Sequence, residues 1–133
     1  MREILFRAKA KEDGMWIEGF PVRIYDYGGL VWDMHPFNTN FEITRSVDPK
    51  TICQFTGLTD KNGKKIFEGD VVLYPCNDQD KPERFTIKFK DGQFVASPVK
   101  ETEDYWDFMV GGYSKEMEVI GNIHDNPELL ENP

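Results

Sequence analysis

The stretch "FTGLTDKNGKKIFEGDVVLYP", Phe55–Pro75, contains three glycine turns directly in front of a run of β-branched and aromatic residues. Asn62-Gly63 is the strongest two-residue hairpin signal, because both residues tolerate a positive φ. We expect this pair to join a strand that ends at Asp60 to another that begins at Lys64. The stretch therefore predicts consecutive short antiparallel strands, which is typical of a β protein.

The second half of this stretch predicts one further strand. Gly69 allows the backbone to turn again, Asp70 can accept backbone N–H groups where a strand begins, and Pro75 ends the strand because it has no N–H to donate. Gly63 and Gly92 are both expected at positive φ in hairpin turns. A phosphate-binding loop is the alternative interpretation of the glycines, but such a loop leads into a helix, and these glycines lead into a strand.

Short strands separated by turn residues are predicted on both sides of this stretch. Residues 3–20 and residues 84–97 each alternate side chains around a glycine turn, which is typical of a β-hairpin. Residues 101–113 are compatible with a strand or with a short helix. Asn126-Pro127 predicts the cap and the first position of a single helical turn near the end of the chain.

Many short strands, frequent turns and little helix predict a mainly β protein that forms a small antiparallel barrel or sandwich. From about Pro49 onward, five short strands around tight turns have the order expected of an SH3-like barrel. We therefore expect an N-terminal β-hairpin region over residues 1–48 and an SH3-like β-barrel over residues 49–133. The two regions are expected to pack together as one compact unit.

The composition limits the kinds of partner that the protein can have. The chain has 133 residues, of which 14% are aromatic, and a chain of this size buries roughly two-thirds of its unfolded surface without needing disulfides or metals. Lys and Arg number 16 against 24 Asp and Glu, and the net charge of −8 disfavours a phosphate backbone as partner. No segment approaches the roughly 20 apolar residues of a membrane span, and the N-terminus does not resemble a signal peptide. We expect a cytoplasmic protein without a membrane partner.

The residues that could carry catalysis or bind a metal are few and scattered. Cys53 and Cys76 lie far apart, so a disulfide is possible, but we expect two free thiols in a reducing compartment. His35 and His124 are the only histidines, and neither has the short paired spacing to another ligand that zinc sites show. No flanking residues indicate a nucleophile beside a base. We therefore expect no catalytic site, no metal and no cofactor.

A basic strand face is one candidate binding surface. Lys88 and Lys90 should share one face of the strand "RFTIKFK", which also carries Arg84, and Phe94 should lie across the hairpin. Basic side chains beside an aromatic ring can bind a single strand of RNA or DNA. The acidic balance of the whole chain opposes the approach of a polyanion, so this surface predicts nucleic-acid binding only as an alternative.

An acidic, aromatic segment is the other candidate surface. In "KETEDYWDFM", four acidic residues surround Tyr105, Trp106 and Phe108. Aromatic rings with a charged rim are typical of protein interfaces. The same pattern also fits a core strand with solvated ends, and the sequence leaves both interpretations open.

Three segments resemble the YopX family of small phage and prophage proteins: "FRAKAKEDGMWIEGF" at residues 6–20, "QFTGLTDKNGKKIFEGDVV" at residues 54–72 and "EVIGNIHDNPELL" at residues 118–130. The resemblance spans nearly the whole chain. It implies an origin in phage genomes of Gram-positive bacteria, an SH3-like second half and no established activity. It supplies no catalytic residues, and His124 stands where similar proteins commonly have Tyr or Phe.

The expected function is that of a non-catalytic accessory protein, encoded by a phage or prophage, that binds a host or phage protein in the host cytoplasm. The alternative is a nucleic-acid-binding accessory protein that uses the basic hairpin face. An enzyme is the third possibility. The sequence does not indicate the identity of the partner or the oligomeric state.

Overall fold

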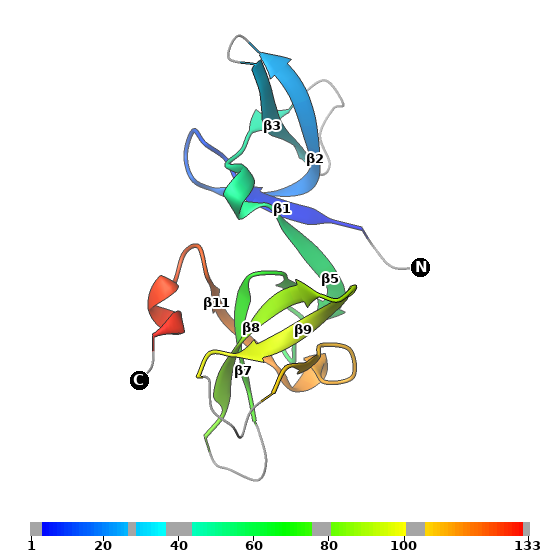
Figure 1. Cartoon of the computed structure of the whole chain (residues 1–133), viewed down its shortest axis with the longest axis vertical. Helices are drawn as coiled ribbons and strands as arrows, with labels where there is room; N and C mark the ends of the chain where they lie inside the picture. The colour runs from blue at the N-terminus through cyan, green and yellow to red at the C-terminus, as the bar shows by residue number, and fades with distance from the viewer. Residues whose placement is uncertain (1–3, 27–28, 37–43, 76–80, 101–105, 132–133) are drawn as a thin grey trace. The chain divides into compact units, whose positions relative to one another are not determined.

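The computed structural model describes residues 4–26, 29–36, 44–75, 81–100 and 106–131. Within these ranges the chain is mainly β, as predicted, and its only helical elements are three short 3₁₀ turns (Figure 1). The strands are β1 (Phe6–Lys9), β2 (Trp16–Asp26), β3 (Gly29–Pro36), β4 (Arg45–Ser46), β5 (Cys53–Thr59), β6 (Lys65–Phe67), β7 (Asp70–Tyr74), β8 (Glu83–Lys90), β9 (Gln93–Pro98), β10 (Phe108–Met109) and β11 (Glu118–Asn122). The 3₁₀ turns are η1 (Pro49–Thr51), η2 (Ser114–Glu116) and η3 (Pro127–Leu130).

The strands form two antiparallel sheets. A six-stranded sheet has the order β4-β3-β2-β1-β5-β6, and a five-stranded sheet has the order β10-β9-β8-β7-β11. The chain divides into two compact units, Met1–Phe55 and Thr56–Pro133. Strand β5 begins in the first unit, beside β1, and ends in the second unit, beside β6. The predicted division between residues 48 and 49 stays a prediction.

The first unit is built on the predicted hairpin of β1 and β2, which the pairing of Phe6 with Gly19 and of Lys9 with Trp16 confirms. The turn η1 is tied to this hairpin, because the backbone N–H of Lys9 donates to Oγ1 of Thr51 at 2.8 Å. The core of the unit consists of small and medium apolar side chains, namely Ala8, Ala10, Ile17, Met34 and Val47.

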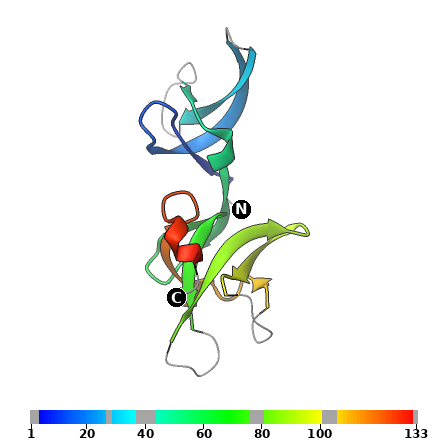
Figure 2. The same cartoon turned by 60° about the vertical axis from the view of Figure 1, so that its left-hand side comes forward.

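Strands β2 and β3 form the longest hairpin of the first unit, and Figures 1 and 2 show them side by side. Their backbones are close at Gly19, where an added Cβ atom would meet the carbonyl group of His35. Only glycine fits this position without a shift of one strand, which explains a residue that otherwise weakens a strand.

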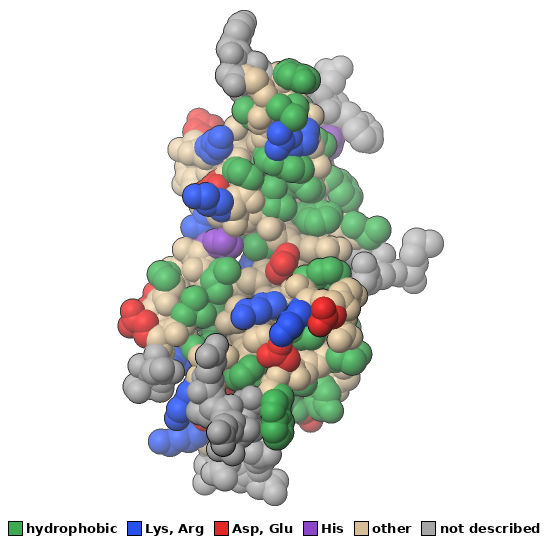
Figure 3. Space-filling view, in the orientation of Figure 1, with side chains coloured by type: hydrophobic (Ala, Val, Ile, Leu, Met, Phe, Trp, Pro, Cys, Tyr) green, Lys and Arg blue, Asp and Glu red, His purple; other side chains and the backbone are tan. Residues whose placement is uncertain are grey.

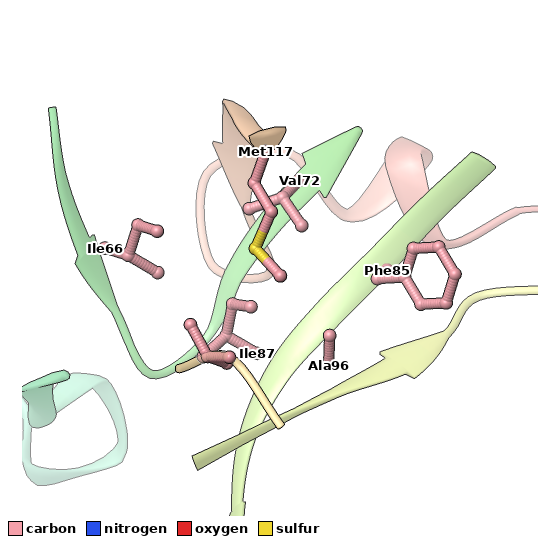
Figure 4. Close-up of a cluster of buried hydrophobic side chains, with 7 residues drawn as sticks. Ile66, Val72, Phe85, Ile87, Ala96 and Met117 are labelled. Carbon is pink, nitrogen blue, oxygen red and sulfur yellow. The ribbon is translucent and has the colours of Figure 1, made fainter. Parts of the chain in front are cut away.

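The second unit is built around the predicted hairpin of β8 and β9. Its core consists of fully buried side chains from four strands and two connections, Ile66, Val72, Phe85, Ile87, Ala96, Val110 and Met117. Six of these side chains are labelled in Figure 4, where the Met117 side chain lies among those of Ile66, Val72 and Ile87. Phe85 and Ile87 alternate into this core as predicted, whereas Phe89 is 52% exposed because the core ends before this position of β8.

The turn between β5 and β6 confirms part of the prediction from Asn62-Gly63. Gly63 has the expected positive φ, 79°, but Asn62 does not, so the predicted two-residue turn is wrong in detail. The side chain of Asp60 shapes the turn instead. Its Oδ1 accepts the backbone N–H groups of Asn62 and Lys64, both at 2.9 Å, and the N–H of Gly63 donates to the Asp60 carbonyl at 3.0 Å.

The second predicted turn of the stretch Phe55–Pro75 has the expected hydrogen bonding at Asp70. Asp70 is buried at the start of β7, and its Oδ2 accepts the backbone N–H of Phe67 at 2.8 Å. Strand β7 ends at Tyr74, directly before Pro75. In the β8–β9 hairpin, Asp91 and Gly92 both have positive φ, 53° and 80°. The predictions for Asp70, Pro75 and Gly92 are therefore confirmed.

The predicted barrel is not confirmed. The described residues form two open sheets, and no pairing between β10 and β11 closes the five-stranded sheet. The segment that was compatible with a strand or a helix contains a two-residue strand, Phe108–Met109, and residues 101–105 lie outside the described part of the chain.

Candidate functional site

The predicted aromatic segment divides into an exposed ring and a partly buried ring. Trp106 is 75% exposed, so at least one ring of the segment is available to a partner. Phe108 packs against the core of the second unit from β10, which pairs it with Ala96 of β9. Tyr105 lies outside the described residues. Phe108 therefore contributes to the core, whereas an interface at Trp106 stays a prediction.

Phe108 belongs to a cluster of four rings in mostly edge-to-face contact, which we call the aromatic cluster: Tyr74, Phe85, Phe108 and Tyr113. The centroid of Phe108 lies 5.0 Å from those of Tyr74 and Phe85 and 5.3 Å from that of Tyr113. Phe85 is buried, whereas Tyr113 is 45% exposed. The cluster therefore begins in the core and ends at the surface, which holds the exposed rings in fixed positions.

A carboxylate lies at the surface end of the aromatic cluster. The hydroxyl group of Tyr74 donates to Oε2 of Glu116 at 3.2 Å, and Glu116 belongs to the turn η2, which directly follows Tyr113. In the described part of the chain, no Lys or Arg forms an ion pair with Glu116. The ammonium group of the adjacent Lys115 donates a hydrogen bond to the hydroxyl of Thr59. The sequence prediction missed this site because Tyr74 lies 42 positions before Glu116 in the sequence. Tyr113 and Glu116 are close in sequence, but only the turn η2 brings them together.

Asp107, between Trp106 and Phe108, is held in its charged form. Its Oδ2 accepts a hydrogen bond from the ammonium group of Lys90 at 3.1 Å. Partial burial raises the pKa of Asp107, but a hydrogen bond from the Ser97 side chain and the charges of Lys90 and Lys88 outweigh burial and place the pKa below its usual value. The lysines of the basic face and the acid of the aromatic segment therefore neutralise each other in part.

The structure places the predicted basic residues on one strand face. Lys88 and Lys90 are exposed on β8, and Arg84 has the same parity on this strand. Phe94 lies across the hairpin as expected, but it pairs with Phe89 and meets its ring edge to face, with 5.0 Å between the ring centroids. Phe94 therefore lies on the opposite face from the lysines, since directly paired residues share a face and neighbours alternate.

Arg84 has a structural partner that sequence reasoning missed. Its Nη1 donates to the carbonyl of Leu129 and its Nη2 to the carbonyl of Glu131, both at 2.8 Å. The turn η3, which begins at Pro127 as predicted, is thereby fixed to β8. The predicted cap residue, Asn126, does not cap this turn with its side chain, and its Oδ1 accepts a backbone N–H of β11 instead.

An open cavity of about 530 Å³ lies beside Arg84 in the second unit. Its lining is a mixture of both charges and a few apolar side chains, including Lys81, Glu83, Val99 and Glu128. Figure 3 likewise shows Lys and Arg side chains interspersed with Asp and Glu side chains over β8 and β9. This mixture does not by itself indicate an anion or a cation as ligand.

Cys53 and His35, two of the residues weighed for catalysis and metal binding, have local backbone partners. Cys53 is buried, and its thiol donates to the carbonyl of Thr51, while Cys76 lies outside the described residues. Nδ1 of His35 lies 3.1 Å from the carbonyl oxygen of Pro36. Among the described ranges, no three His, Cys, Asp or Glu side chains gather as a metal ion requires. Within the same ranges, no helix is long and apolar enough to cross a membrane.

The fold and the surface together define a small, mainly β protein that presents a cluster of aromatic rings beside charged side chains. The chain belongs to the YopX family, because the model of that family, described as YopX protein, matches residues 5–131. The predicted family is thus confirmed over nearly the whole chain.

Individual relatives agree with this assignment. A Bacillus subtilis (strain 168) protein described as "SPbeta prophage-derived uncharacterized protein YopX" is 36% identical over 70 residues, which are 52% of this chain and 52% of that protein. The match thus spans about half the length of this curated relative. The crystal structure of protein EF1440 from Enterococcus faecalis is similar with a TM-score of 0.57 and 28% identity, covering 98% of this chain and 100% of that chain. The crystal structure of protein YopX from Bacillus subtilis, with a TM-score of 0.58 and 22% identity, covers 96% of this chain and 98% of that chain, and this likeness shows a shared fold.

Proposed function

We propose that this protein is a non-catalytic accessory protein that binds a host or phage protein through Trp106 and the adjacent surface of the second unit. The exposure of Trp106, 75%, is the observation that carries the proposal. Exposed tryptophan is costly in water and is enriched among the residues that dominate binding energy at protein interfaces. The SPbeta prophage origin described for the Bacillus subtilis relative supports a phage or prophage origin for this chain as well.

The surroundings of Trp106 support a rigid interface. Phe108, two residues further on, is held by three neighbouring rings, so the backbone beside Trp106 is anchored to the core. Asp107 provides a charged group next to the ring and is itself held by Lys90. A rigid ring with a charged rim loses little entropy on binding, which favours an interface anchor.

Affinity capture from host and infected lysates tests this proposal when wild-type protein is compared with two variants. Trp106→Ala should weaken capture of the partner by about 1–3 kcal/mol, because the ring fills a pocket on the partner. Tyr25→Ala is the matched control, since Tyr25 is an aromatic side chain in the first unit with 83% exposure. The proposal fails if both variants retain the same set of captured proteins as the wild type.

Nucleic-acid binding is the second candidate function, supported by the exposure of Lys88 and Lys90 on one strand face. The pairing of Lys90 with Asp107 and of Arg84 with the chain's own carbonyl groups leaves this surface with less free positive charge. If this surface binds RNA or DNA, the affinity of Lys88→Glu for a single-stranded oligonucleotide should fall, and wild-type binding should weaken steeply with salt. Binding that does not change with salt would argue against this candidate.

We also propose an SH3-like arrangement for the second unit. The strand order β10-β9-β8-β7-β11 supports it, because β11, the last strand in the sequence, pairs with β7, the first strand of this sheet in the sequence. A 3₁₀ turn, η2, also directly precedes β11. In this arrangement the aromatic cluster lies between η2 and the strands β7 and β10. An experimental structure that places β11 away from β7 would contradict the proposal.

A further inference from the structure

The surface end of the aromatic cluster combines two features that recognise a cation. Tyr113 is 45% exposed, and its ring stands nearly perpendicular to that of Tyr74, with 87° between the ring planes and 5.9 Å between the centroids. Glu116 offers its carboxylate at the edge of this pair, 3.2 Å from the hydroxyl of Tyr74. The faces of aromatic rings attract a guanidinium or ammonium group, and a carboxylate forms charge-assisted hydrogen bonds with the same group.

The carboxylate of Glu116 is not neutralised by the described part of the chain. Lys115, its neighbour in the sequence, donates to the hydroxyl of Thr59. Lys61 pairs with Glu118, at 3.5 Å, and not with Glu116. An exposed carboxylate beside an exposed ring is thus available to a ligand from outside.

The distribution of charge between the two units favours a cationic partner at this site. The first unit contains seven Lys and Arg residues against eight Asp and Glu residues, whereas the second unit contains nine against sixteen. The negative charge of the whole chain is therefore almost entirely that of the unit that carries the aromatic cluster. Such a field accelerates the approach of a basic segment and opposes the approach of an acidic one.

We propose that the site formed by Tyr74, Tyr113 and Glu116 binds an arginine side chain in a basic segment of a partner protein. The guanidinium group lies over the exposed ring of Tyr113 and donates to the carboxylate of Glu116, while its aliphatic stem packs on Tyr74. Arginine fits better than lysine, because its planar group can stack on a ring and donate two hydrogen bonds at once. This inference rests on the proposed protein-binding function and specifies the chemistry of the partner.

Titration with synthetic peptides tests the inference. The probes are an arginine-containing basic peptide, the same peptide with lysine at each arginine, and the same peptide with citrulline, which keeps the shape and removes the charge. Binding is followed by the NMR signals of the Tyr74 and Tyr113 rings. The arginine peptide should bind saturably, the lysine peptide should bind more weakly, by roughly 5–10-fold, and the citrulline peptide should not bind.

Variants separate this site from a general attraction between opposite charges. Glu116→Gln and Tyr113→Leu should each lower the affinity for the arginine peptide by roughly tenfold or more, because each removes one of the two contacts. Glu128→Gln is the control, since it removes one exposed charge of the same unit at η3. Equal binding by all variants, or no saturable binding of the arginine peptide, overturns the inference. Partner capture that still depends on Trp106 would then leave the proposed function standing.

Discussion

Oδ2 of Asp60 accepts a hydrogen bond from the backbone N–H of Val119 at 2.9 Å, across 59 positions of the sequence. The other carboxylate oxygen holds the turn between β5 and β6. A single side chain, 1% exposed, therefore joins the β5–β6 turn to the start of β11. Because all of these donors are backbone groups, the contact depends on the carboxylate of Asp60 alone.

Asp60→Asn should lower the free energy of unfolding by about 1–3 kcal/mol, because the amide nitrogen that replaces one oxygen cannot accept a hydrogen bond and leaves a buried N–H without its acceptor. Chemical denaturation of the variant and the wild type measures the loss. Asp91→Asn is a useful comparison, since Asp91 is an exposed carboxylate in the β8–β9 turn of the same unit. A variant as stable as the wild type would show that the contact with Val119 contributes little.

The pH dependence of stability should report the protonation of the Asp60 carboxylate. Burial raises the pKa of Asp60, but the N–H groups of Val119, Lys64 and Asn62 and the charge of Lys64 outweigh burial and lower the pKa below its ordinary value of 3.8. A lowered pKa stabilises the folded state above the ordinary value, and this stabilisation disappears as the pH falls through the lowered value. The stability of wild type should therefore fall below pH 3.8 more steeply than that of Asp60→Asn, measured by denaturation at several pH values.

Gly63→Val should destabilise the protein by about 1–2 kcal/mol, since a β-branched residue is strained at a φ of 79°. No heavy atom lies within 4 Å of the added Cβ position, so the loss reports backbone strain and not a steric clash. Gly111→Val is the control, because its Cβ position is also open and its φ is not positive. Thermal unfolding should therefore separate the two variants, and equal melting temperatures would contradict the expectation.

Gly19→Ala should lower the free energy of unfolding substantially, although it adds only one methyl group. The added Cβ would meet the backbone carbonyl of His35, which cannot move without disturbing the pairing of β2 with β3. We expect a loss of about 1–3 kcal/mol, as for an overpacked core. Gly14→Ala lies in the same unit with open space around its Cβ, and because its φ is positive, at 71°, it controls for strain without a clash. Urea unfolding of the two variants compares the effects.

Arg84→Met should release the turn η3 from β8. The apolar side chain keeps most of the length of arginine and loses both donors to the carbonyl groups of Leu129 and Glu131. Hydrogen exchange at the backbone N–H of Leu129 should become faster, while exchange in the core of β8 stays close to that of the wild type. Lys88→Met, on the same strand face, is the control. Unchanged exchange at Leu129 would mean that η3 is held by other contacts.

Local turn chemistry explains why much of the fold was predictable. Gly63, Gly92, Asp70 and Pro75 act on the backbone within a few residues, and the structure has each of them in its predicted role. The detail at Asn62 was not predictable, because the side chain of Asp60 competes for the same turn and is itself positioned by β11. The closed barrel was expected from strand order, which does not determine whether the sheet edges meet.

The candidate site was predictable only where it depends on adjacent residues. Trp106 and Phe108 were selected from one acidic, aromatic segment, and alternation could not show which ring faces the core. Glu116 was missed because its relation to Tyr74 exists only after the strands pair. Arg84 was assigned to the surface on its charge, although its partners are carbonyl groups 45 and 47 residues away. Contacts of this sequence separation leave no pattern in a single sequence.

Strand β5, Cys53–Thr59, lies partly in each unit, pairing with β1 through Cys53 and Gln54 and lying beside β6 further on. Any cut that separates Phe55 from Thr56 therefore divides one strand instead of a linker. A gene fragment for either half would encode an incomplete sheet edge and invite misassembly. Natural recombination faces the same constraint, so exchange of one half between relatives should preserve function only when the crossover lies outside residues 53–59.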